Sequence, residues 1–448
     1  MTRADRFAVF LSLLGVLAAF LVTDRVFERM AHIEDEMAYV WQAQAISRGH
    51  LTLPSPPEEE SFLVPFVVDY NGQRFGKYPL GWPAMLAIGI RLGIRSLINP
   101  LLAGLGIWLT YRLGKKTFSE TVGLLAAGLT LTSPFFLMNS GSLLSHPFGL
   151  VLSAAFVMAW MDAFGLPGST SPSGPRLWMY TITAGLTLGV LALTRPLTAI
   201  GIGLPFGLHG LYLLVRGDSR TRMRLLVLGG IALGLASLHF VWQYAVTGDP
   251  LLNPYTLWWD YDKVGFGPGV GRSEIGHTLH KAYINTRFSL RGGLRDLFGW
   301  GTFSWIFLPF GLLALIRLRS KRENLRNALL VSSVFPALVL VYLAYWIGSW
   351  LFGPRYYYEG LYSLTILSAA GIALLAGWPL TNDEAWPDYT GWRMGRPLAM
   401  TAMVAFLIAA DVLFYIPIRV GGMHGLYGIA RADLAPFTTQ SAQELEPA

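Results

Sequence analysis

The sequence predicts an all-helical protein that crosses a membrane many times. Of its 448 residues, 53% are hydrophobic and only 14% are charged. A soluble chain of this size cannot bury so many apolar side chains, so the bilayer must solvate many of them. The apolar residues also gather in separate runs, each close to the roughly 20 residues that cross a bilayer. We therefore expect a single transmembrane domain over residues 1–448 and no separate soluble domain.

About eleven apolar runs are expected to be transmembrane helices. The first follows Arg3 and Arg6 as a signal peptide would, but it lacks a convincing small-x-small cleavage site, so we interpret it as a retained helix. The runs cover residues 7–22, 97–111, 121–138, 147–164, 178–194, 197–215, 225–246, 299–316, 328–348, 361–378 and 398–418. Composition alone leaves the segment 79–94 ambiguous.

Basic clusters in the loops resolve this ambiguity. If 79–94 is an interfacial helix on the outer face, every second loop carries a dense group of Lys and Arg, which marks the cytoplasmic side. The groups are Arg3 and Arg6; Arg112, Lys115 and Lys116; Arg216, Arg220, Arg222 and Arg224; and Arg317, Arg319, Lys321, Arg322 and Arg326. We therefore read the net charge of +7 as a mark of topology, expect no nucleic-acid partner, and predict a cytoplasmic N-terminus.

The remaining polar segments all fall on the outer face, where we expect an active site. The segment 24–96 is the first external loop, and 247–298 is a second large external loop with aromatic residues that suit the headgroup layer. The glycine run at 265–271 is not a nucleotide fingerprint, because no strand precedes it and Pro268 interrupts it. The other outer segments are 139–146, 194–196, 349–360 and the tail from Arg419, whereas 165–175 is a polar linker.

The first external loop carries the residues best suited to chemistry. Glu34, Asp35 and Glu36 are consecutive, so on a helix they cannot all face one way, and at most two are expected to be functional. A carboxylate near a low-dielectric boundary can have its pKa raised toward working pH and act as a general base. Alternatively, all three acids form a solvated helix start that favours the helix dipole.

The motifs of this loop resemble a known family. A first helix, an external loop with Asp-Glu-x-x-Tyr at 35–39, a Lys-x-Pro-Leu element at 77–80 and many later spans are similar to the GT-C membrane glycosyltransferases. The similarity points to their protein mannosyltransferase and aminoarabinose transferase branch, glycosyltransferase family 39. It is best over residues 30–200 and ends in an Arg-Tyr element at 355–356. It implies a GT-C-like fold with interfacial helices in the first external loop, a polyprenyl-phosphate sugar donor and inverting transfer.

The resemblance also implies roles for individual residues. Asp35 matches the catalytic acid position, and Lys77 matches a position near the donor phosphate, where a cation stabilises the leaving group. Arg195 lies between two apolar runs, where an arginine is costly unless it faces a polar cavity or an anion, and we expect it to hold the donor phosphate together with Lys77 and Arg355. Arg355 stands at an outer helix start that suits phosphate binding. The simpler alternatives are contact with lipid headgroups for Lys77 and snorkelling to the interface for Arg195.

Further residues are candidates for lining the substrate path, and metal dependence stays open. The candidates are Glu36, Tyr39, Tyr78, Trp82, His146 and Tyr356. His146 falls where many relatives carry an aspartate, and Gly76 replaces the acid that precedes the lysine in the aminoarabinose branch, so that branch's metal site is not carried over. His277 and His280 are a weak metal signal. A divalent metal is therefore an open question, and no cofactor is certain.

The sequence thus predicts a glycosyltransferase of the bacterial cytoplasmic membrane. It would move a hexose or pentose from an undecaprenyl-type phosphate to a glycan, lipid or protein acceptor on the outer face. A flippase for a lipid-linked glycan would instead spread ionisable residues along a path through the membrane. A membrane assembly protein would tolerate substitution of Asp35, Lys77 and Arg355. Neither the sugar nor the acceptor follows from the sequence.

Overall fold

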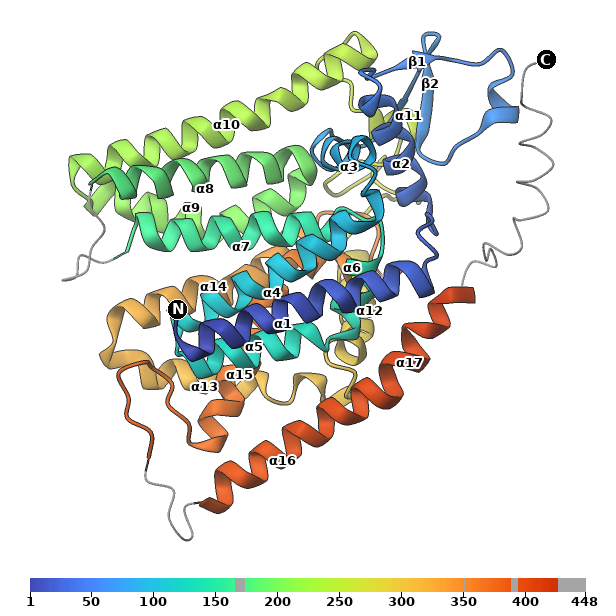
Figure 1. Ribbon diagram of the computed structural model, residues 1–448. Helices are drawn as coiled ribbons and strands as arrows, with labels where there is room; N and C mark the ends of the chain where they lie inside the picture. Colours follow the sequence, from blue (N-terminus) through green and yellow to red (C-terminus); the bar gives the residue numbers. More distant parts are fainter. Residues whose placement is uncertain (166–173, 350, 388–393, 426–448) are drawn as a thin grey trace.

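The computed structural model describes residues 1–165, 174–349, 351–387 and 394–425. Long helices run roughly alongside one another, and short helices and strands gather at one end of them (Figure 1). Most of the predicted linker 165–175, and the tail beyond residue 425, lie outside the described residues.

The long helices make up most of the molecule. They are α1 (Arg3–Leu21), α4 (Ile98–Thr117), α5 (Glu120–Leu131), α6 (Pro134–Gly141), α7 (His146–Ala163), α8 (Gly174–Thr194), α9 (Pro196–Arg216), α10 (Ser219–Thr247), α13 (Leu308–Arg317), α14 (Arg322–Tyr342), α15 (Leu361–Ala376) and α16 (Gly395–Ala410). The short π and 3-10 helices and one short α-helix that extend or join them are η1 (Val22–Val26), η3 (Arg95–Leu97), η4 (Gly301–Trp305), η5 (Leu318–Ser320), η6 (Arg355–Gly360), η8 (Asp411–Tyr415), α17 (Ile416–Arg419) and η9 (Gly421–Gly425). Each predicted apolar run corresponds to one or more of these helices.

The number of spans differs from the predicted eleven. Among the described residues, nine helices are long and apolar enough to cross a membrane. They become ten if α5 and α6, which meet at 60°, form one broken span. The bend falls where Ser133 caps α6 by accepting a hydrogen bond from the Phe136 amide at 3.2 Å, with Pro134 at the first helical position. The count of eleven is not confirmed, because α4 carries Arg112 and two lysines and is not among the nine.

Helix packing at the centre depends on small residues. A Cβ atom at Gly311 would lie 2.0 Å from the Leu367 carbonyl oxygen, and one at Gly371 would lie 2.2 Å from the Phe307 carbonyl oxygen. Helices α13 and α15 therefore approach backbone to backbone, which only glycine permits. Helix α15 is almost wholly buried, so it lies in the core of the bundle.

The polar end of the molecule consists of short elements. They are α2 (Glu34–Ser47), β1 (Leu53–Pro54), η2 (Glu59–Phe62), β2 (Val67–Tyr70), β3 (Gln73–Gly76), α3 (Gly81–Arg91), α11 (Pro254–Trp258) and α12 (Leu279–Asp296). At 11 residues, α3 is about 16 Å long and too short to cross a bilayer, in keeping with an interfacial helix in the segment 79–94. Helix α12 lies within the segment 247–298, expected as the second large external loop.

A small sheet is the main departure from the all-helical expectation. Its three strands are antiparallel in the order β1-β3-β2, with Val67 opposite Gly76 and Tyr70 opposite Gln73. The two-residue turn between β2 and β3 is Asn71-Gly72, and both residues have positive φ angles, of 51° and 72°. These angles are typical of the type I′ turn that joins twisted strands. The sheet matters for the site because β3 ends directly before Lys77.

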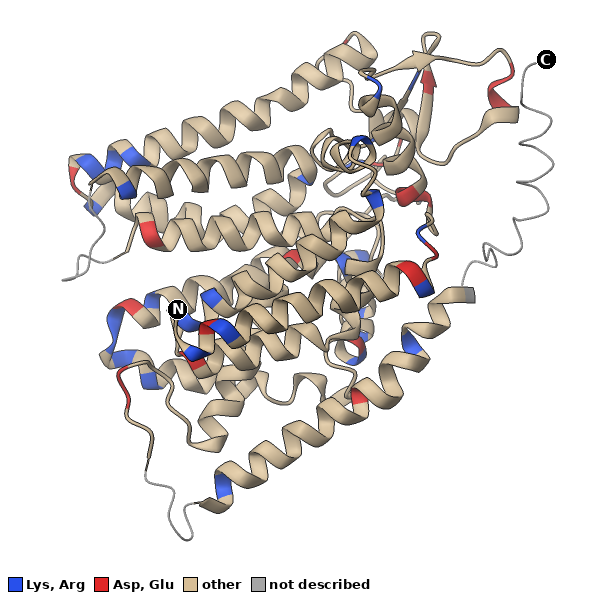
Figure 2. Cartoon of the chain, viewed as in Figure 1, with Lys and Arg blue, Asp and Glu red and all other residues tan. Residues whose placement is uncertain are grey.

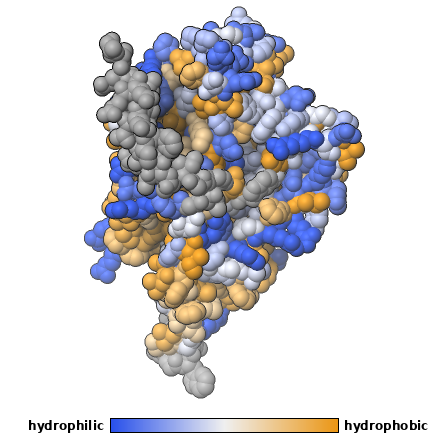
Figure 3. All heavy atoms as spheres, turned by 90° about the vertical axis from the view of Figure 1, so that its right-hand side faces the viewer, coloured by the Kyte–Doolittle hydropathy of each residue, from blue (hydrophilic) through white to orange (hydrophobic). Residues whose placement is uncertain are grey.

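Charged and hydrophilic residues are distributed unevenly between the two ends. Lys and Arg gather at the end that holds the N-terminus, away from the short elements (Figure 2). Turning the opposite end toward the viewer reveals many hydrophilic side chains across its upper part (Figure 3). The predicted basic loops therefore share one end, and the described parts of the predicted external segments share the other.

Candidate active site

A cavity of about 380 Å³ opens among the short elements of the polar end. It is lined by the start of α2, the segment after β3, the turn between α8 and α9, the second large loop and the segment before α15. Eight of the ten predicted site residues line it: Asp35, Tyr39, Lys77, Tyr78, His146, Arg195, Arg355 and Tyr356. Segments up to 320 residues apart in the chain thus supply one polar chamber.

Asp35 lies in the first turn of α2 and faces this chamber. Its Oδ2 atom is 3.0 Å from Nη1 of Arg355, and its Oδ1 atom accepts a hydrogen bond from the Tyr78 hydroxyl. Burial alone would raise the pKa of Asp35, but the Arg355 charge, the Tyr78 hydrogen bond and the Lys77 charge together hold it below its usual value. The expectation of a raised pKa is therefore wrong, because the cations outweigh desolvation. Asp35 is ionised at neutral pH.

Arg355 has a buried donor that no described residue satisfies. It begins η6, and its Nη1 binds Asp35, whereas its Nε is enclosed and has no hydrogen-bond partner within the described residues. A buried guanidinium donor without a partner is costly unless a ligand or water supplies the acceptor. Its planar fork suits the two oxygens of a phosphate.

Lys77 follows β3 and is only 3% exposed. Its Nζ lies 3.2 Å from Oδ2 of Asp262, whose other oxygen accepts hydrogen bonds from Tyr345 at 3.0 Å and Trp346 at 2.9 Å. Aromatic rings surround the ammonium with centroids 3.8 to 5.5 Å away: Phe66, Tyr255, Trp259 and Tyr78. Burial lowers the pKa of Lys77 against the opposing charges of Asp262 and Asp35. Lys77 is thus a paired cation in an aromatic cage, and sequence reasoning missed its partner Asp262.

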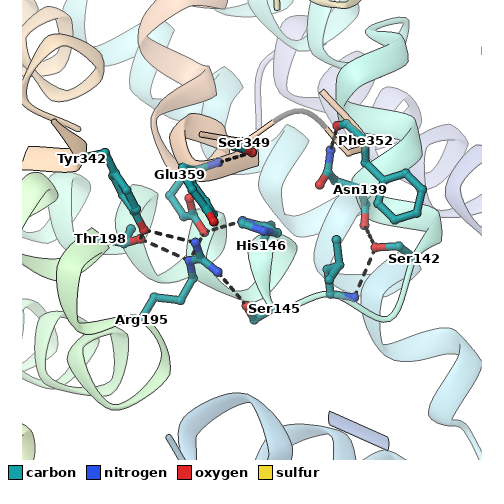
Figure 4. Close-up of polar contacts among 12 residues, drawn as sticks. Asn139, Ser142, Ser145, His146, Arg195, Thr198, Tyr342, Ser349, Phe352 and Glu359 are labelled. Carbon is teal, nitrogen blue, oxygen red and sulfur yellow. Dashed lines mark hydrogen bonds and ion pairs between the residues drawn. The ribbon is translucent and has the colours of Figure 1, made fainter. Parts of the chain in front are cut away.

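Arg195 forms the centre of a buried polar network (Figure 4). It occupies the turn between α8 and α9, and its Nε lies 3.0 Å from Oε1 of Glu359. Its two Nη atoms donate to Ser145 at 3.3 Å and Tyr342 at 3.1 Å. Oε1 of Glu359 also lies 3.0 Å from Nδ1 of His146. Arg195 therefore faces a polar cavity, as expected, but Glu359 already pairs it, and no sequence signal marked that glutamate.

Glu36 and Trp82 do not line the cavity, which corrects their expected place. The Glu36 carboxylate is buried, and it accepts the backbone amides of His32 at 2.7 Å and Leu143 at 2.6 Å, so it fastens the start of α2 to the 142–145 loop. Burial raises its pKa despite these bonds. Trp82 is also buried, and its Nε1 donates to the Leu143 carbonyl at 2.9 Å. Both residues hold the framework together.

The described residues offer no set of side chains arranged as metal ligands. Within the described residues, no group of three or more His, Asp or Glu side chains is arranged to hold a metal ion. His277 precedes α12, and its Nε2 lies 2.9 Å from the Leu343 carbonyl. The pair of His277 and His280 accordingly shows no metal-ligand arrangement.

Comparison with solved structures identifies the fold. The structures of ArnT from Cupriavidus metallidurans match over the whole bundle: the complex with undecaprenyl phosphate has a TM-score of 0.60 at 15% identity and covers 98% of this chain and 81% of that one. The apo structure gives 0.61 at 16% identity, with coverage of 100% and 82%. Archaeal AglB from Archaeoglobus fulgidus, in complex with an inhibitory peptide and a dolichol-phosphate, gives 0.54 at 14% identity and covers 93% of this chain and 56% of that one.

The chain therefore has the fold of the GT-C membrane glycosyltransferases. No protein-family profile and no curated protein matches the sequence. At such low identity, the likeness defines the architecture, and the roles of the residues rest on the geometry of the cavity.

Proposed function

We propose that this protein is an inverting glycosyltransferase. It moves a hexose or pentose from a polyprenyl phosphate to an acceptor hydroxyl on the outer face of the bacterial cytoplasmic membrane. The observation that carries the proposal is the cavity in which the Asp35 carboxylate meets Arg355 and Lys77. Transfer of a sugar from a phosphate leaving group requires a base for the acceptor proton and, beside it, cations that bind the phosphate.

The chemistry uses the two sides of this arrangement. The acceptor oxygen attacks the anomeric carbon and gives its proton to Asp35, while the bond from that carbon to the phosphate oxygen breaks. The electron pair of this bond leaves with the phosphate, which becomes a monoester on the carrier. Asp35 is ionised at neutral pH because its neighbours hold its pKa low. It receives the proton as bond formation to the anomeric carbon makes the acceptor hydroxyl acidic. Attack opposite the phosphate inverts the anomeric centre.

The departing phosphate gains charge that Arg355 and Lys77 can stabilise. Arg355 lines the chamber, and its guanidinium, paired with Asp35 through Nη1, places a positive charge in a largely buried site. Lys77 adds a fixed positive charge, and the aromatic residues around it give the sugar and the isoprenoid chain apolar surface. ArnT, which shares the fold, was solved with undecaprenyl phosphate, and this supports a carrier of the same class.

The outer face is supported by the distribution of charge. Basic clusters lie at the end of the bundle that holds the N-terminus (Figure 2). Residues of the short elements at the other end line the cavity. Because Lys and Arg are enriched in cytoplasmic loops, the N-terminus is assigned to the cytoplasm and the cavity to the periplasmic side.

The test is transfer by purified protein from a panel of hexoses and pentoses linked to undecaprenyl phosphate. Asp35→Asn should lower kcat about 100-fold or more, because it removes the base, while undecaprenyl phosphate still binds. Glu60→Gln is the matched control, since Glu60 is an exposed acid of the same loop. Unchanged turnover in Asp35→Asn would remove Asp35 from its role, and absence of transfer by the unaltered protein from every donor would contradict the function.

A further inference from the structure

His146 and Glu359 form a buried pair whose geometry fixes the hydrogen positions on the imidazole. Oε1 of Glu359 lies 3.0 Å from Nε of Arg195; as the counter-ion of this guanidinium, Glu359 is a carboxylate, whose oxygens only accept hydrogen bonds. The same atom lies 3.0 Å from Nδ1 of His146, so Nδ1 must carry the hydrogen (Figure 4). A second proton would place another positive charge beside Arg195 in a buried site, which is unfavourable. The neutral imidazole then has its lone pair on Nε2.

The His146 ring borders the cavity on one side. His146 lines the cavity, whereas Glu359 and Tyr358, which pack against the other side of the imidazole, do not. Within the described residues, no hydrogen bond to Nε2 is formed, and Nε2 is not among the fully enclosed polar atoms without a partner. The cavity therefore contains an oriented acceptor that the fold itself leaves unused.

The position of this acceptor indicates what it binds. Arg355 and Glu359 belong to the same short helix, η6, and Arg355 and His146 both line the cavity, so the imidazole and the guanidinium that we assign to the donor phosphate share one chamber. The group attached to that phosphate is a sugar, and its hydroxyls are hydrogen-bond donors. A second anion would not bind here, because it has no hydrogen to donate to the Nε2 lone pair and would be repelled by the Glu359 carboxylate.

We propose that Nε2 of His146 accepts a hydrogen bond from a hydroxyl of the donor sugar, and that Glu359 is the positioning residue that fixes its tautomer. The inference rests on the proposed function and deepens it, because it makes this pair a determinant of which carrier-linked sugar binds. A site built to bond a hydroxyl discriminates strongly against a ligand that lacks it.

The experiment measures binding without an acceptor, so it does not depend on turnover. Affinities of the full-length protein are determined for undecaprenyl phosphate and for a panel of undecaprenyl-phosphate hexoses. His146→Phe keeps a ring next to Tyr358 and removes the acceptor. It should weaken binding of the preferred sugar-linked carrier roughly tenfold and leave binding of undecaprenyl phosphate unchanged. His146→Gln offers an amide oxygen near the same place and should retain most of the affinity.

Thermal unfolding of both variants is measured alongside, and a folded His146→Gln keeps the test decisive if His146→Phe does not fold. In that case, the inference would be overturned if His146→Gln bound both undecaprenyl phosphate and the sugar-linked carrier at least tenfold more weakly than the unaltered protein does. Equal losses for the two ligands in His146→Phe would place His146 at the phosphate, and no loss for either would leave it without a ligand. Both results contradict the inference. Neither touches the role of Asp35, which the transfer assay tests separately.

Discussion

The pairing of Lys77 with Asp262 gives the sharpest energetic prediction. Both side chains are nearly inaccessible, and their charged atoms are 3.2 Å apart. Removing one partner of a buried ion pair typically costs about 3–5 kcal/mol, because the other charge stays buried without compensation. Cation–π contacts with the aromatic cage stabilise a desolvated ammonium by up to about 2 kcal/mol, which offsets part of this cost. Asp262→Asn should therefore lower the free energy of unfolding by about 1–3 kcal/mol.

A double-mutant cycle isolates this pair. Lys77→Met should destabilise less than Asp262→Asn does, because Asp262 keeps hydrogen bonds from Tyr345 and Trp346. The double variant should be more stable than the sum of the single effects predicts, with a coupling of about 2 kcal/mol. Unfolding by SDS in mixed micelles, followed by tryptophan fluorescence, measures all four proteins. If the two single effects on the free energy of unfolding were additive, the reasoning would be refuted, because the Lys77–Asp262 contact would then contribute no coupling energy.

Two further predictions test the site and its frame. Arg355→Gln removes the cation that most lowers the pKa of Asp35, so the acid limb of kcat/KM should move to higher pH, whereas Lys77→Met should move it less. The sign agrees with linkage: ionised Asp35 stabilises the unaltered fold above its ordinary pKa, and this stability is lost as pH falls through its lowered value. An acid limb of kcat/KM that does not move in Arg355→Gln would contradict the pairing of Arg355 with Asp35. Gly81→Ala places a Cβ atom 2.8 Å from the Thr194 amide nitrogen and should cost about 1–3 kcal/mol in thermal unfolding, whereas Gly128→Ala, with open space around it, should be neutral.

Much of the fold follows from composition and loop charge. Apolar runs of bilayer length and alternating basic loops indicate the helices, because both reflect the solvent and need no knowledge of packing. The sheet was missed since its strands have four residues or fewer, although Asn71-Gly72 between β2 and β3 was a readable hairpin signal.

The candidate site was predicted only in part, for a related reason. Asp35, Lys77 and Arg355 were selected by a family resemblance, and the structure brings them together. The partners of Lys77 and His146 were not predicted, because Asp262 lies 185 residues from Lys77 and Glu359 lies 213 residues from His146. Such pairs depend on how distant helices and loops pack. The pKa of Asp35 was misjudged for the same reason, since desolvation was considered without Arg355.

The central claim is that Asp35, Arg355 and Lys77 surround the head group of one polyprenyl-phosphate donor. A structure of the protein with undecaprenyl phosphate tests it most directly. The account predicts phosphate oxygens within charge-assisted hydrogen-bond distance of the Arg355 guanidinium, about 2.7–2.9 Å, with Asp35 on the side of the anomeric carbon away from the phosphate. A phosphate bound at another surface, with Arg355 still engaged only by Asp35, would contradict it.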